Sequence, residues 1–458
     1  MIGVALSINF RILGIRSFYS PRYQRILIVL QYLIIRKGVL LMKNKKFWTY
    51  ENKLVLIVFF TIGFVFFDRL TINYLFPMIS LDLGLNYTQL GLLGAALALT
   101  WSVSGPLGGF ISDKVKSKKS MFAILVLAFS VVSLMHGLAQ SFAVLFVLRL
   151  LMGIVEGPLI PQTQSILAME SSERRKGFNL GFTMNTSNAL FGSILAPVLI
   201  VALATNFDWH TAFYLTIIPG IILSFAILKS VKNPDPVKFH VMHATKSTEK
   251  IKVKDVLKHR NIWLSVVIFS LVMTTLMAFQ IFGPTFLVQA KGLSETTMSF
   301  VMASFGVGYA IFGFLIPTLS ERTGRKPASL VSGFLLILIP LSIVFVDSIP
   351  LMMLLLFIGS AGSGVIGMSM SVIPVESVPL QYSGLAIGLT IGIGELIGGF
   401  LNPMVNGALA DIYGIQTPLY VAAAAGALAF LLCFLYKETA PAKVQPTQGS
   451  EVKIGVHV

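Results

Sequence analysis

The chain has 458 residues, of which 55% are hydrophobic and only 12% are charged. A soluble globular protein has about 25% charged residues, so this chain lacks the polar surface that a folded particle needs in water. Its net charge of +16 would suggest a nucleic-acid partner for a soluble protein, whereas in a membrane protein positive charge collects in cytoplasmic loops. The composition therefore excludes a soluble globular protein and indicates a chain embedded in a lipid bilayer, with no nucleic-acid partner.

Residues 1–52 form a basic segment that we expect to be a cytoplasmic leader. Between Tyr23 and Met42 only residues 26–35 are free of charge, which is too short a run for a transmembrane helix. No small-residue cleavage site follows, so the segment is not a signal peptide. One interpretation is a basic helix at the membrane interface. We favour the other, in which Met42 is the true start and residues 1–41 are not part of the native protein.

Twelve apolar segments follow the leader, and in lipid each must be helical to satisfy its own backbone hydrogen bonds. The expected segments are 54–80, 87–111, 121–139, 142–167, 179–204, 211–228, 262–288, 297–319, 329–346, 351–375, 385–410 and 418–435. A polar linker over 229–261 separates two bundles of six helices, 53–228 and 262–436, and a polar tail covers 437–458. The predicted fold is an all-α membrane protein with twelve transmembrane helices in a 6+6 repeat.

The charges in the loops predict how the helices are oriented. Loops on one side carry basic clusters, and loops on the other carry mainly acids with Lys291 as their only lysine or arginine. Basic residues favour the cytoplasmic side, so both ends of the chain are expected in the cytoplasm. The basic loops hold Lys114, Lys116, Lys118, Lys119, Arg174, Arg175, Lys176, Arg322, Arg325 and Lys326, and the acidic loops hold Asp82, Asp208, Glu295, Asp347 and Asp411.

An internal repeat occupies the loop after the second helix of each half. The first copy has Gly109 followed by Asp113 and Lys114, and the second has Glu321, Arg322 and Arg325, each with an acid, a base and a basic cluster at matching offsets. Two copies of one six-helix unit are typical of a transporter that works by rocking. A solvated charge run that follows the positive-inside rule would explain the lysines, but not an acid at a fixed offset.

This repeated loop resembles the signature loop of the major facilitator superfamily, approximately G-x-x-x-D-R-x-G-R, over a chain that runs from about 53 to 436. The resemblance implies that these residues form a gating loop and that Asp113 caps a neighbouring helix, which helps to lock the outward-facing state. The first copy has Lys114 and Lys116 in place of the first arginine and the glycine, and the second has Pro317 for the glycine and Glu321 for the aspartate.

Five ionisable residues lie at membrane depth, where each charge costs about 2.5–3.5 kcal/mol or more. Such residues must face one another or a wet cavity, and they usually mark a transport route. Arg149 and Glu156 are seven residues apart and so share one helix face. A purely structural ion pair, for example Asp68 with Arg149, is the alternative. The five residues are Asp68, Arg69, Arg149, Glu156 and Glu395.

In the positions of the first four of these residues, the chain resembles the anion:cation symporter branch of the superfamily, which includes sugar-acid carriers. The branch implies that Arg69 binds a substrate carboxylate, that Asp68 and Glu156 carry coupling protons, and that Arg149, in the same site, tunes Asp68. Independent chemistry agrees, because a planar guanidinium suits a carboxylate and burial favours the neutral form of an acid. Phe66 and Thr71 depart from the branch's pattern.

Three further residues extend the candidate site. Glu395 is not expected from the branch, and it is either a third proton site, a contact for a substrate hydroxyl or amine, or a packing residue. Gln280 and Asn402 offer neutral hydrogen bonds from the second half, although polar residues often hold membrane helices together instead.

The sequence thus predicts a proton-coupled symporter of a small organic anion, without a cofactor, acting as a monomer in the cell membrane. The alternative is a proton-coupled antiporter that exports drugs or cations. An enzyme is disfavoured, because the sequence has no metal-ligand cluster, phosphate-binding loop or nucleophile elbow.

Overall fold

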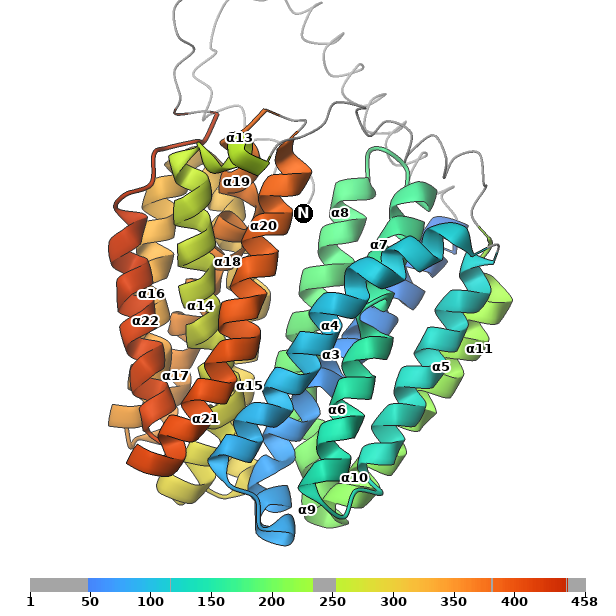
Figure 1. Ribbon diagram of the computed structural model, residues 1–458, viewed down its shortest axis with the longest axis vertical. Helices are drawn as coiled ribbons and strands as arrows, with labels where there is room; N and C mark the ends of the chain where they lie inside the picture. Colours follow the sequence, from blue (N-terminus) through green and yellow to red (C-terminus); the bar gives the residue numbers. More distant parts are fainter. Residues whose placement is uncertain (1–47, 116, 234–252, 380–381, 442, 444–458) are drawn as a thin grey trace, which may run out of the picture. The chain divides into compact units, whose positions relative to one another are not determined.

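The computed structural model describes residues 48–115, 117–233, 253–379, 382–441 and 443 (Figure 1). Our expectations for residues 1–47 and for most of the linker and tail lie outside the described residues. The described part is helical throughout and contains no strand, as expected for an all-α membrane protein. Residues Lys53–Val458 belong to one compact unit, whose described helices are considered below.

The first half contains six apolar helical segments, several of them with a break or a wider π turn. Asn86 caps the second with its side chain and forms a capping box with Gln89, and Asp208 caps the last. In chain order the elements are α3 (Tyr50–Leu83), α4 (Tyr87–Lys114), α5 (Lys118–His136), α6 (Phe142–Glu156) with α7 (Leu159–Glu170), α8 (Lys176–Gly181) with η1 (Phe182–Thr186), η2 (Asn188–Ile200) and α9 (Val201–Asn206), and α10 (Trp209–Leu215) with α11 (Ile217–Ser230).

The second half begins after the linker and repeats this pattern. Its elements are α13 (Val253–Leu257), α14 (Arg260–Thr285) with η3 (Phe286–Ala290), α15 (Glu295–Thr323), α16 (Arg325–Phe345), α17 (Ile349–Gly359) with η4 (Ser360–Ser363), α18 (Gly364–Gly367), η5 (Met368–Val372) and α19 (Ile373–Glu376), α20 (Ser383–Gly394) with η7 (Glu395–Leu401) and α21 (Asn402–Tyr413), and α22 (Thr417–Cys433). Figure 1 shows the blue-to-green helices gathered in one bundle and the yellow-to-red helices in the other.

Eleven helices in the described residues are long and apolar enough to cross a membrane, which confirms a multi-pass arrangement. The twelfth expected segment is α22, an apolar helix of 17 residues that falls just short of that length. Its crossing of the bilayer, and with it the count of twelve, stays a prediction. Most observed helices extend the expected segments by a few residues, because polar residues such as those of Tyr50–Asn52 continue the helical backbone beyond the apolar run. Helices α5, α16 and α22 instead end one to three residues before the expected boundary.

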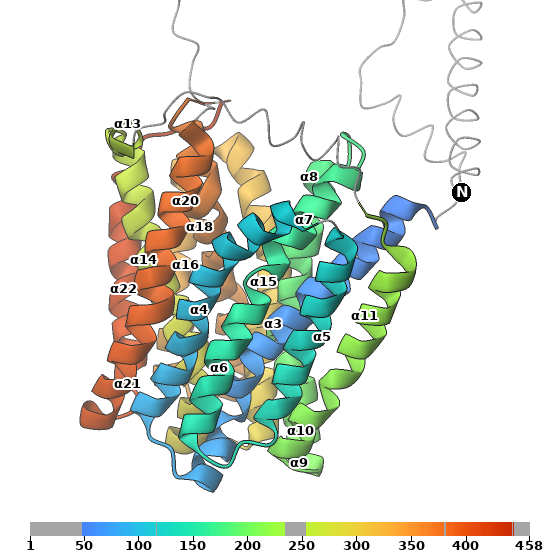
Figure 2. The same ribbon diagram turned by 45° about the vertical axis from the view of Figure 1, so that its right-hand side comes forward.

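The two halves pack closely at the end farthest from the linker, which we call the distal end. There the beginning of α4 lies beside the end of α21, as both views show (Figure 1, Figure 2). Asp411 of α21 accepts hydrogen bonds from the backbone N–H groups of Tyr87 and Thr88, both 2.9 Å, and from the Thr88 hydroxyl at 2.5 Å. Gly407 allows this approach, because an added Cβ would lie 2.6 Å from the Tyr87 carbonyl oxygen.

We expect Asp411→Ala to open the distal end. The substitution removes three charge-assisted hydrogen bonds between the halves, enough to shift the population by about tenfold or more toward a state that is open there. Double electron–electron resonance measures the distance between spin labels placed at Leu81 and Tyr413, which are both exposed. This distance reports how far the two halves separate at the distal end. Asp347→Ala is the matched control, because Asp347 binds Lys291 of its own half at 2.8 Å. An unchanged distance distribution in Asp411→Ala would contradict this role.

Candidate functional site

Arg69 lies on α3 at the boundary between the two halves. Its guanidinium Nη2 is 3.8 Å from Oε2 of Glu395 on η7 of the other half, and the two side chains are 13% and 14% exposed. The guanidinium also lies over the ring of Trp101 on α4, at 5.1 Å from the ring centroid. The contact with Glu395 is long, and the contact with Trp101 uses the face of the guanidinium. Arg69 can therefore still bind a second anion through its N–H groups.

Arg69 lines a small cavity of about 20 Å³, which we call the Arg69 cavity. Its volume is close to the roughly 10–15 Å³ that one water needs. Helices α3, α4 and α6 of the first half and α14 and η7 of the second contribute to it. The lining residues are Arg69, Leu70, Asn73, Gly94, Leu97, Ala98, Arg149, Met277, Ile281 and Gly399.

Arg149 reaches the Arg69 cavity from α6 and is 2% exposed. Its Nη2 donates a hydrogen bond of 3.1 Å to the backbone carbonyl of Arg69, which ties α6 to α3. Its Nε has no hydrogen-bond partner in the described ranges of the chain. The alternative of an Asp68–Arg149 ion pair is not seen, since the structure shows no such pair within its described residues.

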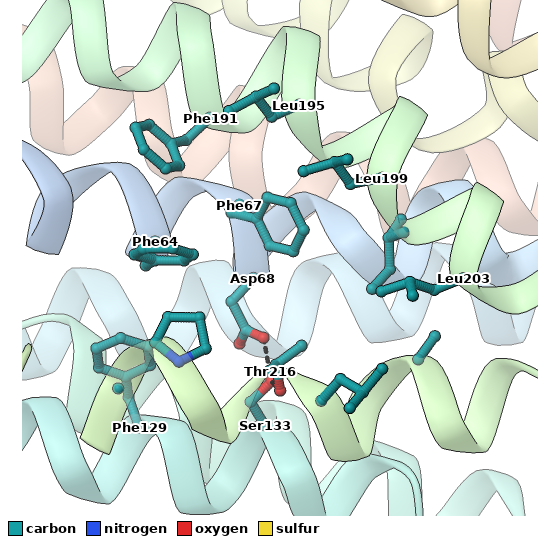
Figure 3. Close-up of a pocket in the computed structure, with 15 residues that line it drawn as sticks. Phe64, Phe67, Asp68, Phe129, Ser133, Phe191, Leu195, Leu199, Leu203 and Thr216 are labelled. Carbon is teal, nitrogen blue, oxygen red and sulfur yellow. Dashed lines mark hydrogen bonds between the residues drawn. The ribbon is translucent and has the colours of Figure 1, made fainter. Parts of the chain in front are cut away.

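Asp68, the neighbour of Arg69, faces a different side of α3. It accepts a hydrogen bond from Ser133 of α5, and the Ser133 hydroxyl is 2.7 Å from that of Thr216. Figure 3 shows the carboxylate between the rings of Phe64 and Phe67 on one side and these hydroxyls on the other. It lines a second, largely apolar cavity of about 250 Å³ between α3, α5, η2, α9, α10 and α11, which we call the lateral cavity.

Glu156 is completely buried on α6, and neither of its carboxyl oxygens has a hydrogen-bond partner among the described residues. Oε2 of Glu395 is likewise buried without a hydrogen bond. Buried acids without donors are unfavourable as anions, so both are suited to hold a proton.

The neutral residues predicted from the second half are placed differently from one another. Gln280 is partly buried on α14 beside Ile281, which lines the Arg69 cavity. Asn402 donates hydrogen bonds of 3.3 Å to the carbonyls of Thr274 and Gly398 and accepts one of 2.6 Å from Asn406. These contacts are those of a residue that holds η7 and α21 against α14, and a substrate contact for Asn402 stays a prediction.

The two predicted gating loops differ in what can be described. Gly109 lies on α4, and Asp113 and Lys114 end that helix, but the side chains of the last two are outside the described residues. In the second copy Glu321 and Arg322 are exposed at the end of α15. Arg325 is 7% exposed and forms a bidentate pair with Glu376, with Nη2–Oε1 at 2.8 Å.

Sequence reasoning missed the acid that caps this second loop. Glu438, just after α22, accepts hydrogen bonds from the backbone N–H groups of Arg325 at 2.7 Å and Lys326 at 3.1 Å. Partial burial alone would raise the pKa of Glu438, but the backbone donors of Ala440, Arg325, Lys326 and Thr439 outweigh it and lower the pKa below its ordinary value. Its position at the first turn of α16 is typical of an acid that stabilises a helix N-terminus.

Helical bundles with ionisable residues buried between them define a multi-pass membrane transporter. The chain belongs to the Major Facilitator Superfamily, whose family model matches residues 58–294 and, in a second copy, 276–456. The resemblance predicted from the repeated loop is therefore confirmed, as is the two-repeat architecture, and the chain is a transporter rather than an enzyme.

Three curated relatives have names that point to different functions. The chain is 29% identical to the hexuronate transporter of Bacillus subtilis over 287 residues, which is 60% of this chain and 67% of the relative. It is 28% identical to the quinolone resistance protein NorA of Staphylococcus aureus over 378 residues, 81% of this chain and 93% of that protein. It is 24% identical to the probable galactarate/D-glucarate transporter GudP of Bacillus subtilis over 420 residues, 83% and 90% of the two chains.

A solved structure confirms the fold. The crystal structure of a bacterial homolog to the human lysosomal transporter Spinster, in an inward-facing and occupied conformation, has a TM-score of 0.71 with this chain. The match covers 86% of this chain and 97% of that one at 17% identity. At this identity the similarity shows the shared architecture and nothing of the substrate.

Proposed function

We propose that this protein is a proton-coupled importer of small organic anions, sugar acids or other carboxylates, that works by rocking its two halves. The observation that carries the proposal is the position of Arg69 between the halves, where its pair with Glu395 is 3.8 Å long. A guanidinium can bind a carboxylate through two parallel hydrogen bonds. The single 3.8 Å contact with Glu395 uses neither of them, so Arg69 can still form both with a substrate. The similarity to the hexuronate transporter and to the probable galactarate/D-glucarate transporter supports the same class of substrate.

The same contact supplies a way to couple the anion to a proton. A substrate carboxylate and the carboxylate of Glu395 compete for Arg69, and two anions beside one cation repel each other. Protonation of Glu395 removes this repulsion and frees the guanidinium. Substrate and proton therefore bind together, which is symport. Asp68 and Glu156 are the proposed further proton carriers, and Arg149 holds the backbone at Arg69 in position.

The proposed topology has twelve transmembrane helices with both ends in the cytoplasm, in the cell membrane. The basic loops at the linker end and the acids at the distal end support this orientation. Helix α22 would complete the count with 17 residues, or roughly 26 Å at 1.5 Å per residue, which a slightly thinned bilayer accommodates. The proposed domains are the bundles 53–228 and 262–436, joined by the linker 229–261. We propose a monomer.

A second candidate function is the export of hydrophobic cations in exchange for protons. The lateral cavity favours it, because Asp68 is the one acid among apolar side chains and the rings of Phe64, Phe67, Phe129 and Phe191 face the same space (Figure 3). Carboxylates and aromatic faces both attract organic cations. The similarity to the quinolone resistance protein NorA points the same way.

Uptake into proteoliposomes tests the first proposal against the second. We expect a six-carbon sugar acid to enter faster with an inward proton gradient than without one, and Phe129→Ala in the lateral cavity to leave this uptake unchanged. If the carboxylates do not enter and a fluorescent organic cation is instead transported in a way that Phe129→Ala impairs, the second function replaces the first.

A further inference from the structure

A third cavity lies between the halves, nearer the linker end than the distal end. Its volume is about 280 Å³, and its walls come from η1 of the first half and from α15, η4, α18 and η5 of the second. Pro317 and Thr318, in the last two turns of α15, place it toward the linker end. We call it the hydroxyl cavity.

The lining of the hydroxyl cavity is uncharged, and polar side chains are interspersed among apolar ones. Five of its side chains carry a hydroxyl or an amide, namely Asn185, Tyr309, Thr318, Ser363 and Ser371. None of the lining residues is Asp, Glu, Lys, Arg or His. Hydroxyl and amide groups both donate and accept hydrogen bonds, so they complement a ligand whose groups do the same. This chemistry differs from that of the Arg69 cavity, which holds two arginines.

One of these hydroxyls has no hydrogen-bond partner in the part of the chain that the structure describes. Ser363 is 3% exposed, and its Oγ makes no hydrogen bond within the described residues. Buried polar groups are nearly always hydrogen-bonded, so an unpaired one that lines a cavity points to a ligand group. The adjoining wall is η5, a π turn that contributes Met370, Ser371 and Val372. Such turns are frequent at functional sites of helices.

A glycine keeps the cavity open. Gly313 of α15 lines it, and a Cβ built at this position meets no atom within 4 Å. A side chain at this position would therefore begin in free space, and its outer atoms would occupy the cavity. The position therefore allows the cavity to be filled while the surrounding helices stay in place.

We propose that the hydroxyl cavity binds the hydroxyl groups of a polyhydroxylated molecule. Resting on the proposed function, this narrows the substrate class to carboxylates that carry several hydroxyls. A site built from hydrogen-bonding groups rejects an analogue that lacks the matching hydroxyls, because its own groups are then left unpaired.

Binding of an uncharged polyol tests this inference separately from carboxylate transport. The probe is galactitol at millimolar concentration, added to the purified full chain, with thermal unfolding as the readout. Wild type and Arg69→Ala should both be stabilised, whereas Gly313→Leu should not. General osmolyte stabilisation acts on all three proteins equally. If carboxylates are not transported but this pattern holds, the proposed function fails and the hydroxyl cavity stands.

A second pair of variants covers the case in which Gly313→Leu does not fold. Ser363→Ala should weaken the apparent affinity for galactitol about two- to tenfold, the effect of losing one neutral hydrogen bond. Ser332→Ala is the matched control, because Ser332 is also buried without a hydrogen bond but does not line the cavity. No stabilisation of wild type, or equal losses in Ser363→Ala and Ser332→Ala, would overturn the inference.

Discussion

Replacement of Arg69 by alanine will reduce carboxylate uptake by about two to three orders of magnitude, or ~3–4 kcal/mol. The substitution removes the cation that α3 contributes to the Arg69 cavity. The substrate carboxylate then loses its partner for two parallel hydrogen bonds. Arg69→Lys keeps the charge but not the planar fork, so we expect it to retain part of the activity. Initial rates of uptake of a labelled sugar acid into proteoliposomes give the measurement.

Arg174→Ala is the control for Arg69→Ala, because Arg174 is an exposed arginine in a basic loop. Uptake should change little in this variant. Thermal unfolding of the purified proteins separates a lost binding group from a lost fold. Carboxylate uptake that survives in well-folded Arg69→Ala would remove the basis of the proposed substrate class.

Replacement of Glu395 by glutamine will uncouple uptake from protons. The neutral amide mimics the protonated acid, so Arg69 stays free for the substrate at every pH. Uptake down a substrate gradient should continue, but accumulation driven by an inward proton gradient should collapse to about the equilibrium level. The measurement is the ratio of internal to external substrate at steady state, with and without the gradient.

Glu173→Gln serves as the control, because the Glu173 side chain is 93% exposed. Accumulation should then be as in wild type. Proton-driven accumulation that persists in Glu395→Gln would assign the coupling to Asp68 or Glu156 instead.

Hydropathy and loop charge predict most of the fold. Long apolar runs have one stable conformation in lipid, which is why the expected segments and the observed helices agree. The buried charges were also found from the sequence, because an ionisable residue in an apolar run is conspicuous at any helix rotation. Arg69 contacts both Arg149 and Glu395 at the boundary between the halves, and their role in a shared substrate site stays a prediction.

The partners of these charges could not be predicted from the sequence. Successive residues point about 100° apart around a helix, so Asp68 faces Ser133 and the lateral cavity while Arg69 faces the other half. Which of the two points inward depends on packing that one sequence does not reveal. The role of Asp411 was missed for a similar reason, because its partner Tyr87 is 324 positions away.

The central claim is that Arg69 accepts a carboxylate when Glu395 takes up a proton. The most direct test is to add substrate to the purified protein in weakly buffered solution and to measure the pH change. This change gives the number of protons that the protein takes up for each substrate molecule bound. We predict that wild type absorbs a proton with each carboxylate, and that Glu395→Gln binds the carboxylate while absorbing fewer. Binding without proton uptake in wild type, or undiminished uptake in Glu395→Gln, would contradict the claim.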